Sequence, residues 1–507
     1  MKMNYFITTP IYYTNDKPHI GHAYTTISCD IIARYNKLLN KNVLFLTGTD
    51  EHGQKVEKAA KDSKIDPKQF VDKLSINFEK LVTFLDCDAD DFIRTTEERH
   101  IIAAQSFWNK LLKNDQIYLS DYEGWYSVRD EAFYQESELV NINGKLQTKL
   151  GAPVDLIKEE SYFFKLSNYE ERLINFYEKN PNIISPKSRY NEVLSFIKNG
   201  LKDLSISRTT FKWGVQVPNN PKHVMYVWID ALCNYLTAID YPNTESQKFK
   251  NYWPATHIVG KDILRFHAVY WPAFLMAADL EPPKKIFAHG WWTNEGQKIS
   301  KSLGNVIDPY LIVQEFGLDQ IRYFLFSEVP FGNDGDFSKK AISKRVNADL
   351  SNNYGNLIQR ILTFIVNNCN SSIKPSFDFT EDDKNLLNNF SDKYKNYSNF
   401  MNNFQIDRAI KSVMELLSNT NAYVDSQAPW SLKKTNHERM NVVLFIILNI
   451  IIKCTIMLIP IIPSSTSKVL SCFNIQKKLI GFQNFEDLVD YEITVNKPKP
   501  IFPRIDE

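Results

Sequence analysis

The sequence predicts an α/β protein in which a parallel sheet is split by an insertion and followed by a bundle of helices. Strand-like runs alternate with amphipathic helices over residues 1–115, and such alternation is typical of a parallel sheet with crossover helices. The pattern resumes only near residue 225, and from about residue 338 segments with helical periodicity follow one another. The chain has 507 residues, which is long enough for about three domains.

The first strand and helix are predicted at the N-terminus of the chain. A strand over Tyr5–Thr9 ends at Pro10, and an amphipathic helix follows Pro18. The four residues His19-Ile20-Gly21-His22 stand at this helix N-terminus, where backbone N–H groups and the positive dipole end favour a phosphate. Gly21, which has no side chain, lets a base or ribose approach the backbone closely. The apolar positions of the helix are Ala23, Ile27, Ile31, Ala33 and Leu38.

The second strand and the later strands complete the predicted sheet. A buried run at 43–47 is followed by Asp50, and a helix passes through Val56 and Ala60. Asp50 follows the strand on a loop, where a carboxylate is a suitable partner for an ammonium group withdrawn from water. The later strands are expected at 257–259 and 286–288, with a helix over Ile263–Ala278 between them.

A second motif lies far along the chain, at Lys298-Ile299-Ser300-Lys301-Ser302. Gly296 and Gly304 bracket it, so two ammonium groups stand on a segment that is predicted to move. A mobile segment with two positive charges can stay close to the negatively charged pyrophosphate as it leaves. Together with the histidine motif it indicates one ATP-handling site, whereas either motif alone is a weak signal.

The insertion, at about 118–225, is rich in aromatic residues. Asn143-Gly144 lies between two strand-like runs and predicts a two-residue hairpin.

Helical periodicity after residue 338 predicts a bundle, with segments at 340–368, 381–400, 405–427 and 436–459. The run Val442–Ile462 is nearly long enough to cross a bilayer, but Lys453 and Asn449 lie near its middle and Pro460 near its end. A central lysine costs about 2.5–3.5 kcal/mol on insertion. A buried bundle helix is therefore favoured over a membrane span.

Net charge, cysteine spacing and the N-terminal segment indicate which ligands and which cellular compartment to expect. The net charge is only +1, so binding to a nucleic acid would depend on local patches, for which 339–345 and 433–439 are candidates. The six cysteines form no C-x-x-C pair, as expected for free thiols in a reducing compartment. The N-terminus has neither a signal peptide nor a transit sequence, which predicts a cytoplasmic protein.

Six motifs in one order carry a family resemblance. Besides the histidine and lysine motifs, the chain has Thr9-Pro10-Ile11-Tyr12-Tyr13, Gly48-Thr49-Asp50-Glu51-His52-Gly53, Tyr226-Val227-Trp228-Ile229-Asp230-Ala231 and Gly260-Lys261-Asp262-Ile263. The histidine and lysine motifs are similar to the signatures of class I aminoacyl-tRNA synthetases. The full set resembles the methionyl-tRNA synthetases, and the resemblance covers nearly the whole chain.

The resemblance implies a Rossmann-like catalytic domain split by a connective insertion, followed by an all-α anticodon-binding bundle. The expected divisions are 1–117, 118–225, 226–337 and 338–507. The implied reaction is activation of L-methionine by ATP and Mg²⁺ to methionyl-adenylate, with release of pyrophosphate, and then transfer to the 3′-terminal adenosine of tRNA(Met). The catalytic residues it implies are His19, His22, Lys298 and Lys301. Binding of ATP is expected to add Gly21, Gly260, Lys261, Asp262 and Ser300.

The resemblance also implies a methionine pocket, whose aromatic edges and sulfur-directed donor would select a thioether. Its expected members are Ile11, Tyr13, Asp50, Trp228, Ala231, Leu232, Tyr235, Ile263 and His267. An ordinary aromatic core is the alternative reading of the same residues. Leu232 stands where some relatives have proline, which puts only the shape of the wall in doubt.

For tRNA, the resemblance assigns the anticodon to Asn356, Arg360, Pro429 and Trp430, since unpaired bases stack on aromatic planes. Ser127 and Asp130 stand where some relatives have a zinc-binding cysteine pair, so no zinc is expected. The chain is also expected to lack an added dimerisation module and to be a monomer that binds no membrane. Two alternatives remain, another class I synthetase for cysteine or leucine, and a catalytically silent RNA-binding paralogue.

Overall fold

The computed structural model describes residues 2–14, 17–129, 132–134, 136–142, 145–149, 151–298 and 305–505, with the backbone alone at 122, 132, 133, 137 and 298. The chain forms two compact units. The sheet unit comprises Asn4–Pro18 and Leu44–His289, and the bundle unit comprises Met1–Met3, His19–Val43 and Gly290–Glu507.

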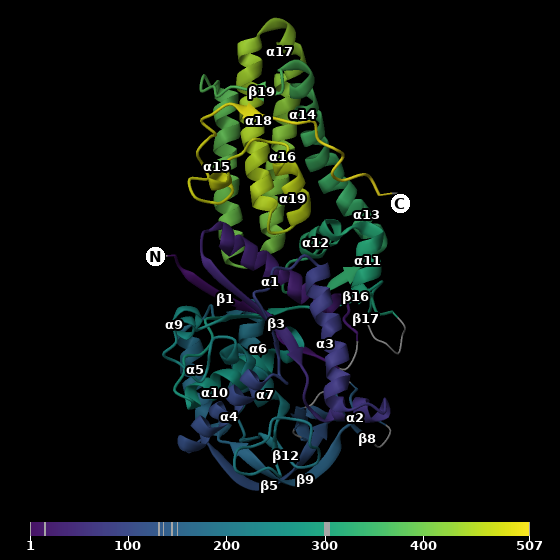
Figure 1. Ribbon diagram of the computed structural model, residues 1–507, viewed down its shortest axis with the longest axis vertical. Helices are drawn as coiled ribbons and strands as arrows, with labels where there is room; N and C mark the ends of the chain where they lie inside the picture. Colours follow the sequence, from purple (N-terminus) through teal and green to yellow (C-terminus); the bar gives the residue numbers. More distant parts are fainter. Residues whose placement is uncertain are drawn as a thin grey trace. The chain divides into compact units, whose positions relative to one another are not determined.

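The sheet unit contains a parallel sheet of seven described strands, of which β1 and β3 are labelled in Figure 1. Its order is β10-β15-β14-β1-β3-β2, and β4 pairs with β3 outside this path. Gly48 is required in β3 because a Cβ there would lie 2.0 Å from the carbonyl oxygen of Ile93 in β4. The strands are β1 (Asn4–Thr8), β2 (Tyr12–Tyr13), β3 (Asn42–Asp50), β4 (Asp91–Arg94), β10 (Ile184–Ser185), β14 (Thr256–Gly260) and β15 (Lys285–His289). The four predicted strands are confirmed as β1, β3, β14 and β15.

Helices of the sheet unit alternate with these strands along the chain, as expected of a parallel sheet. The helix predicted through Val56 and Ala60 is confirmed as α2. The helices are α2 (Gln54–Asp62), α3 (Pro67–Phe84), α4 (Glu98–Lys113), α5 (Glu170–Lys179), α6 (Lys187–Lys198), α7 (Val227–Leu232), α8 (Asn234–Thr237), α9 (Gln247–Tyr252) and α10 (Trp271–Ala277).

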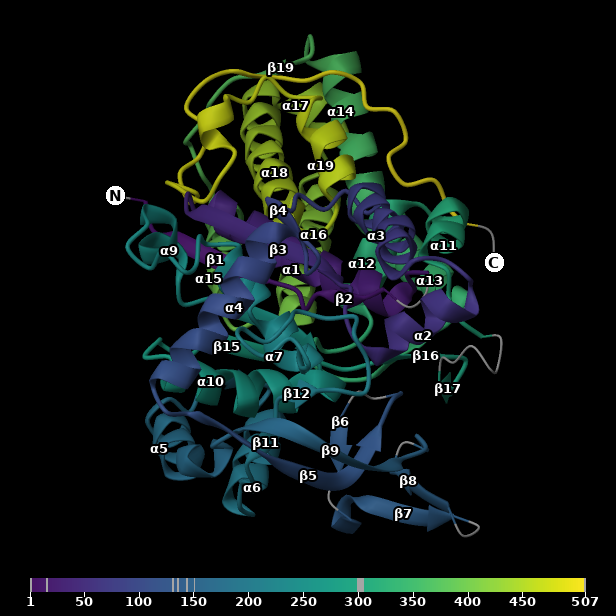
Figure 2. The same cartoon turned by 60° about the horizontal axis from the view of Figure 1, so that its bottom comes forward.

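The insertion is built on a long antiparallel ribbon, β5 (Ile117–Ser127) with β9 (Asp155–Phe164). Figure 2 shows this ribbon with β6 and β11 in one sheet and the β7–β8 hairpin beyond it. The hairpin pairs Ile142 with Lys145, as predicted, although Asn143 and Gly144 themselves lie outside the described residues. The remaining strands here are β6 (Ala132–Tyr134), β7 (Leu139–Ile142), β8 (Lys145–Thr148), β11 (Leu204–Ser205), β12 (Ser207–Arg208) and β13 (Val224–Met225).

Two expectations for the sheet unit are corrected. The parallel pattern was predicted to resume only near residue 225, but β10 lies within 118–225 and pairs with β15 in parallel. A strand of two residues is too short to give a periodic signal. The helix predicted over Ile263–Ala278 is broken into a 3₁₀ turn (Lys261–Ile263), a π turn (Phe266–Tyr270) and α10. Pro272, which has no N–H group, removes one bond of a regular helix at this place.

The bundle unit contains the predicted helical bundle (Figure 1), in which α15, α16 and α18 pack against one another. The four predicted segments are confirmed, except that a π turn at Val346–Gly355 interrupts the first of them. The helices are α1 (Ile20–Leu38), α11 (Pro309–Phe316), α12 (Leu318–Ser327), α13 (Lys339–Arg345), α14 (Asn356–Asn368), α15 (Glu381–Asn402), α16 (Ile406–Gln427), α17 (Pro429–Thr435), α18 (His437–Leu458) and α19 (Pro463–Leu470). Short strands are β16 (Trp292–Asn294), β17 (Gln297–Lys298), β18 (Gly335–Phe337), β19 (Ser372–Ile373) and β20 (Ile493–Thr494).

A fully buried ion pair joins three parts of the bundle unit. Arg322 on α12 donates from Nη2 to Oδ2 of Asp30 on α1 at 2.5 Å, and both side chains are 0% exposed. The same guanidinium donates from Nε to the carbonyl oxygen of Ile461 and from Nη2 to that of Pro460. Asp30 also accepts from Arg34. The position of α1 is therefore set by α12 and by the turn between α18 and α19.

The apolar helix α18 is long and apolar enough to cross a membrane, yet 94% of its most apolar window is buried inside the protein. Its two central polar residues bind the segment Phe485–Val489. Lys453 donates from Nζ to the carbonyl oxygens of Phe485 and Asp487, and Asn449 accepts the Val489 N–H. The predicted buried helix is confirmed.

The Lys453 ammonium makes the stability of the bundle unit depend on pH. Burial lowers its pKa to about 8 from an ordinary value of 10.5. Between these values the folded chain has released a proton that the unfolded chain retains, so the unfolded state binds more protons and stability rises with pH. Relative to Lys453→Met, the native chain is expected to gain on the order of 2 kcal/mol as pH increases from 7.5 to 10.

Thermal melting of both proteins across this pH range measures the difference. Lys468→Met, at an exposed position on α19, serves as the control and is expected to show a constant difference. Parallel pH profiles for the native chain and Lys453→Met would contradict the assignment.

Candidate active site

The N-terminus of α1 holds the two histidines in a reciprocal cap. His19 Nδ1 accepts the N–H of Gly21 at 3.0 Å, and His22 Nδ1 accepts the N–H of His19 at 3.0 Å. Because both Nδ1 atoms are acceptors, the ring proton of each neutral imidazole must be on Nε2. Burial and the nearby His19 ring keep the pKa of His22 well below its usual value. The helix start therefore presents imidazole donors in a fixed tautomer as well as a positive dipole end.

Gly21 and Ile20 fix the surroundings of this cap. A Cβ at Gly21 would lie 2.9 Å from Cε1 of His19, so a side chain there would displace the ring. The N–H of Ile20 donates to the carbonyl oxygen of Ile307 at 3.1 Å. The chain that follows the lysine motif therefore lies against the start of α1.

The lysine motif itself is only partly described. Lys298 ends β17, which pairs with β16 through Thr293, but nothing is described of the Lys298 side chain. Ser300 and Lys301 lie outside the described residues. Their assignments therefore remain predictions.

Three predicted pocket residues form a hydrogen-bonded chain in the sheet unit. His267 Nδ1 lies 3.0 Å from the carbonyl oxygen of Ile263, and its Nε2 lies 2.8 Å from the hydroxyl oxygen of Tyr235. A carbonyl oxygen only accepts, so Nδ1 carries the proton and Nε2 accepts from Tyr235. Burial lowers the pKa of His267 to about 4. The imidazole is therefore neutral at physiological pH.

Trp228 provides the aromatic edge of the same region. Its ring stacks on Phe266 with centroids 3.7 Å apart and lies edge-on to His267 at 6.1 Å. Ala231, Leu232 and Tyr235 are buried in the core of the sheet unit. Four other predicted pocket residues are only half-buried at the border of that core, and these are Ile11, Tyr13, Trp228 and Ile263.

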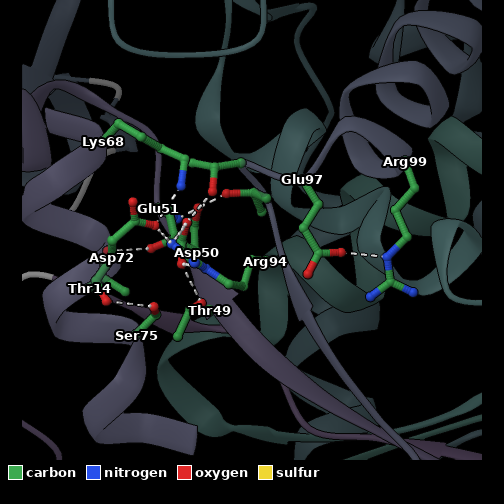
Figure 3. A network of polar contacts seen from close by, with 12 residues as sticks. Thr14, Thr49, Asp50, Glu51, Lys68, Asp72, Ser75, Arg94, Glu97 and Arg99 are labelled. Atoms are coloured by element: carbon green, nitrogen blue, oxygen red, sulfur yellow. Dashed lines mark hydrogen bonds and ion pairs between the residues drawn. The ribbon is translucent and has the colours of Figure 1, made fainter.

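Asp50 lies at the end of β3, opposite Tyr13 of β2, and is 8% exposed. Figure 3 shows it among a network of polar side chains. Its neighbour Glu51 accepts from Nε and Nη2 of Arg94 at 2.7 and 3.0 Å and from the hydroxyl of Thr49 at 2.7 Å. This bidentate pair fixes the backbone that carries Asp50.

The motif Gly260-Lys261-Asp262 begins at the last residue of β14 and continues into the 3₁₀ turn Lys261–Ile263. A Cβ on Gly260 would lie 2.5 Å from Oδ1 of Asp262. The absence of a side chain at this position therefore allows the Asp262 carboxylate to fold back over the strand end, where ligands bind in open α/β sheets.

The predicted anticodon residues come together in the bundle unit. Trp430 is 43% exposed, and the Arg360 guanidinium lies 6.0 Å from its ring centroid. Arg360 also donates to Asp425 at 3.0 Å and to Asn421 at 3.2 Å. Asn356 is exposed one turn before Arg360 on α14, and Pro429 is the first residue of α17. The structure thus groups an exposed ring, an oriented guanidinium and an amide.

The two candidate basic patches contain paired charges. Lys339 binds Glu315 and Arg345 binds Glu328, while Arg439 binds Asp383. These ion pairs weaken the prediction that 339–345 and 433–439 act as patches. Ser127 is buried at the end of β5 and Asp130 lies outside the described residues, so the expected lack of zinc stays a prediction.

Sequence reasoning missed a buried cluster in the sheet unit. Asp230 on α7 binds His52 and His100 at 2.7 Å each. Two of these residues stand inside recognised motifs, Gly48–Gly53 and Tyr226–Ala231, and could have been selected there. His100 has no local signal, because only the fold brings α4 beside α7.

Profiles of known families match the chain along most of its length. The profile described as "tRNA synthetases class I (M)" matches residues 5–145 and 141–362. The profile described as "Anticodon binding domain of methionyl tRNA ligase" matches residues 375–506.

Full-length relatives and solved structures agree with these profiles. The methionine–tRNA ligase of Rickettsia felis is 51% identical and covers 100% of the chain and 99% of the relative. That of Mesorhizobium japonicum is 46% identical over 99% of the chain and 97% of the relative. A structure of Mycobacterium tuberculosis methionyl-tRNA synthetase with methionyl-adenylate is 42% identical and superimposes with a TM-score of 0.96, covering 99% of this chain and 100% of that one.

Proposed function

We infer the chemistry of this chain from the family to which it belongs, the methionine–tRNA ligases of the class I aminoacyl-tRNA synthetases. It activates L-methionine with ATP to methionyl-adenylate, releases pyrophosphate and transfers the methionyl group to the 3′-terminal adenosine of tRNA(Met). The observation that carries this function is agreement over the whole chain, since the relative that superimposes at TM-score 0.96 was solved with methionyl-adenylate.

Adenylation requires that the carboxylate and the α-phosphate meet in line while charge on the phosphates is neutralised. We assign His19 and His22 to the α-phosphate and ribose side, because the cap places the ring proton of each on Nε2. Lys298, Ser300 and Lys301 are assigned to the β- and γ-phosphates. In the sheet unit we assign the nucleotide to the strand-end turn of Gly260, Lys261 and Asp262.

ATP enters as its Mg²⁺ complex, and we assign the ion to the nucleotide phosphates. The described residues contain no group of three or more His, Cys, Asp or Glu that could hold a metal.

Methionine is assigned to the sheet unit. Asp50 would face the ammonium group, and the edge of Trp228 would lie along the side chain. His267 is neutral, and its Nε2 accepts a hydrogen bond from Tyr235. A thioether beside it would therefore meet polarisable aromatic groups and no charge. Ile11, Tyr13, Ala231, Leu232 and Ile263 would complete the wall.

The bundle unit would read the anticodon, with Trp430 as the stacking plane and Asn356 and Arg360 as readers of base edges. Asp425 and Asn421 hold the guanidinium in one orientation, which supports this role. We propose that the enzyme is a cytoplasmic monomer, with 338–507 as its tRNA-reading part.

Exchange of pyrophosphate into ATP tests the reaction directly. Purified protein is assayed with each of the twenty amino acids in a chelator-treated buffer that contains only Mg²⁺. Exchange with methionine alone is expected, without added zinc. Exchange with cysteine or leucine would contradict the pocket assignment, and no exchange at all would support a silent RNA-binding protein.

The substitution His19→Asn separates the two roles of that residue. Asparagine is a strong N-cap, so the stability of α1 should change by less than about 0.5 kcal/mol. It removes the Nε2 donor, however, and adenylation should fall about a hundredfold, as on loss of one transition-state donor. His19→Ala should lose the same activity and about 1 kcal/mol of stability as well. Full exchange activity in His19→Asn would limit the residue to capping.

The substitution Trp430→Ala is expected to act only when tRNA is present. Base stacking is worth about 1–3 kcal/mol, so kcat/KM for tRNA should fall about tenfold to a hundredfold while pyrophosphate exchange is retained. Trp430→Phe keeps an aromatic plane and should recover most of the charging. Loss of exchange together with charging in Trp430→Ala would mean that the ring is structural.

A further inference from the structure

Three buried side chains from separate segments meet at one carboxylate. His52 follows β3, His100 lies on α4 and Asp230 lies on α7. Asp230 and His100 are 0% exposed and His52 is 5% exposed. His52 Nδ1 lies 2.7 Å from Oδ2 of Asp230, and His100 Nε2 lies 2.7 Å from Oδ1. Each carboxylate oxygen therefore has one imidazole partner.

The directions of these bonds follow from the chemistry of the groups. An ionised carboxylate only accepts, so His52 donates from Nδ1 and His100 donates from Nε2. The two histidines hold the pKa of Asp230 at about 2, although burial alone would raise it. The second nitrogen of His100 lies 3.2 Å from the hydroxyl of Thr237 on α8. The carboxylate is thus ionised and hydrogen-bonded by two fixed donors.

Three of the four segments that meet at this cluster carry proposed methionine contacts, whereas α4, which holds His100, carries none. Asp230 lies next to Ala231 and two residues after Trp228. His52 lies two residues after Asp50, and its carbonyl oxygen accepts the hydroxyl of Tyr13 at 3.1 Å. Thr237 lies two residues after Tyr235 on the same short helix. The cluster therefore connects the proposed ammonium partner with the proposed thioether wall.

The helices α7 and α8 depend on such contacts for their position. They contain six and four residues. An isolated helix needs about 12–15 residues even for marginal stability. Apolar packing holds a short helix in the core but has little directional preference. Two charge-assisted hydrogen bonds to one carboxylate are directional, so they restrict both rotation and sliding of α7.

We propose that His52, His100 and Asp230 form a positioning clamp that sets the geometry of the methionine pocket, so that its loss weakens methionine binding and leaves ATP binding unchanged. The proposal rests on the proposed methionine contacts. None of the three residues needs to touch a substrate. They act through Asp50, Trp228 and Tyr235.

Steady-state pyrophosphate exchange, normalised to folded active sites, tests the clamp. Asp230→Asn replaces one acceptor by an amide donor that faces an imidazole N–H. The KM for methionine should rise about tenfold to a hundredfold, as for a displaced contact or a lost bond to a charged group. The KM for ATP should stay within about twofold of the native value.

Paired substitutions distinguish positioning from a general loss of stability. The amide of Asn can place an N–H near the position of Nδ1, and that of Gln near Nε2. His52→Asn and His100→Gln should therefore retain most of the affinity for methionine, whereas His52→Ala and His100→Ala should lose it. Tyr169→Phe, which removes a part-buried hydrogen bond to Gln116 between segments without pocket residues, should leave both KM values unchanged.

The outcomes separate this inference from the proposed function. Native enzyme that exchanges with methionine, together with Ala variants that keep the native methionine KM, would overturn the clamp and leave the function intact. Equal increases in both KM values would mean that the cluster stabilises the protein in general. This outcome would also contradict the clamp. Failure of the native enzyme to exchange with methionine would instead reject the function. Should Asp230→Asn not fold, the four histidine variants give the same decision.

Discussion

The bundle unit depends on one fully buried charge pair, that of Asp30 and Arg322. Two ions withdrawn from water are costly unless each is fully hydrogen-bonded, and breaking such a pair costs about 3–5 kcal/mol. Here the guanidinium also binds the carbonyl oxygens at 460 and 461, so the pair is satisfied only when α1, α12 and the turn after α18 are all in place. Because α1 begins with the two proposed phosphate-binding histidines, this electrostatic requirement also determines where those histidines stand within their unit.

The sheet unit solves a similar problem at the ends of its strands. Parallel strands bring polar residues to one edge, where they would be expensive to bury without partners. Glu51, directly after β3, is matched by Arg94, and Asp230 on α7 is matched by two imidazoles, of which His52 also follows β3. All of these bonds join protein groups to one another, so they hold the side chains and backbone beside the proposed methionine contacts in one arrangement. Pre-organisation of this kind reduces the entropy that must be lost when a flexible thioether side chain is held.

Sequence patterns predicted the long elements and the motifs but not the contacts that only the fold creates. The strands β1, β3, β14 and β15 and the bundle helices have clear periodicity, and the motif residues around Asp50 and Trp228 could be selected by resemblance. The two-residue strand β10 and the π turns have no periodic signal. His100 could not be associated with Asp230, since 130 residues separate them. The basic runs looked like binding patches, and their acidic partners, such as Glu315 and Asp383, are distant in sequence.

The contacts of α18 with the late segment Phe485–Val489 bear on the order in which the protein is synthesised and folds. The ammonium of Lys453 and the amide of Asn449 are bound by residues that the ribosome adds more than thirty positions later. Until those residues emerge, a helix apolar enough to enter a bilayer lacks part of its cover. During that interval the lysine and asparagine are the polar groups that disfavour insertion into a membrane. The same two side chains thus disfavour membrane insertion of the nascent helix and later bind the segment Phe485–Val489 in the folded protein.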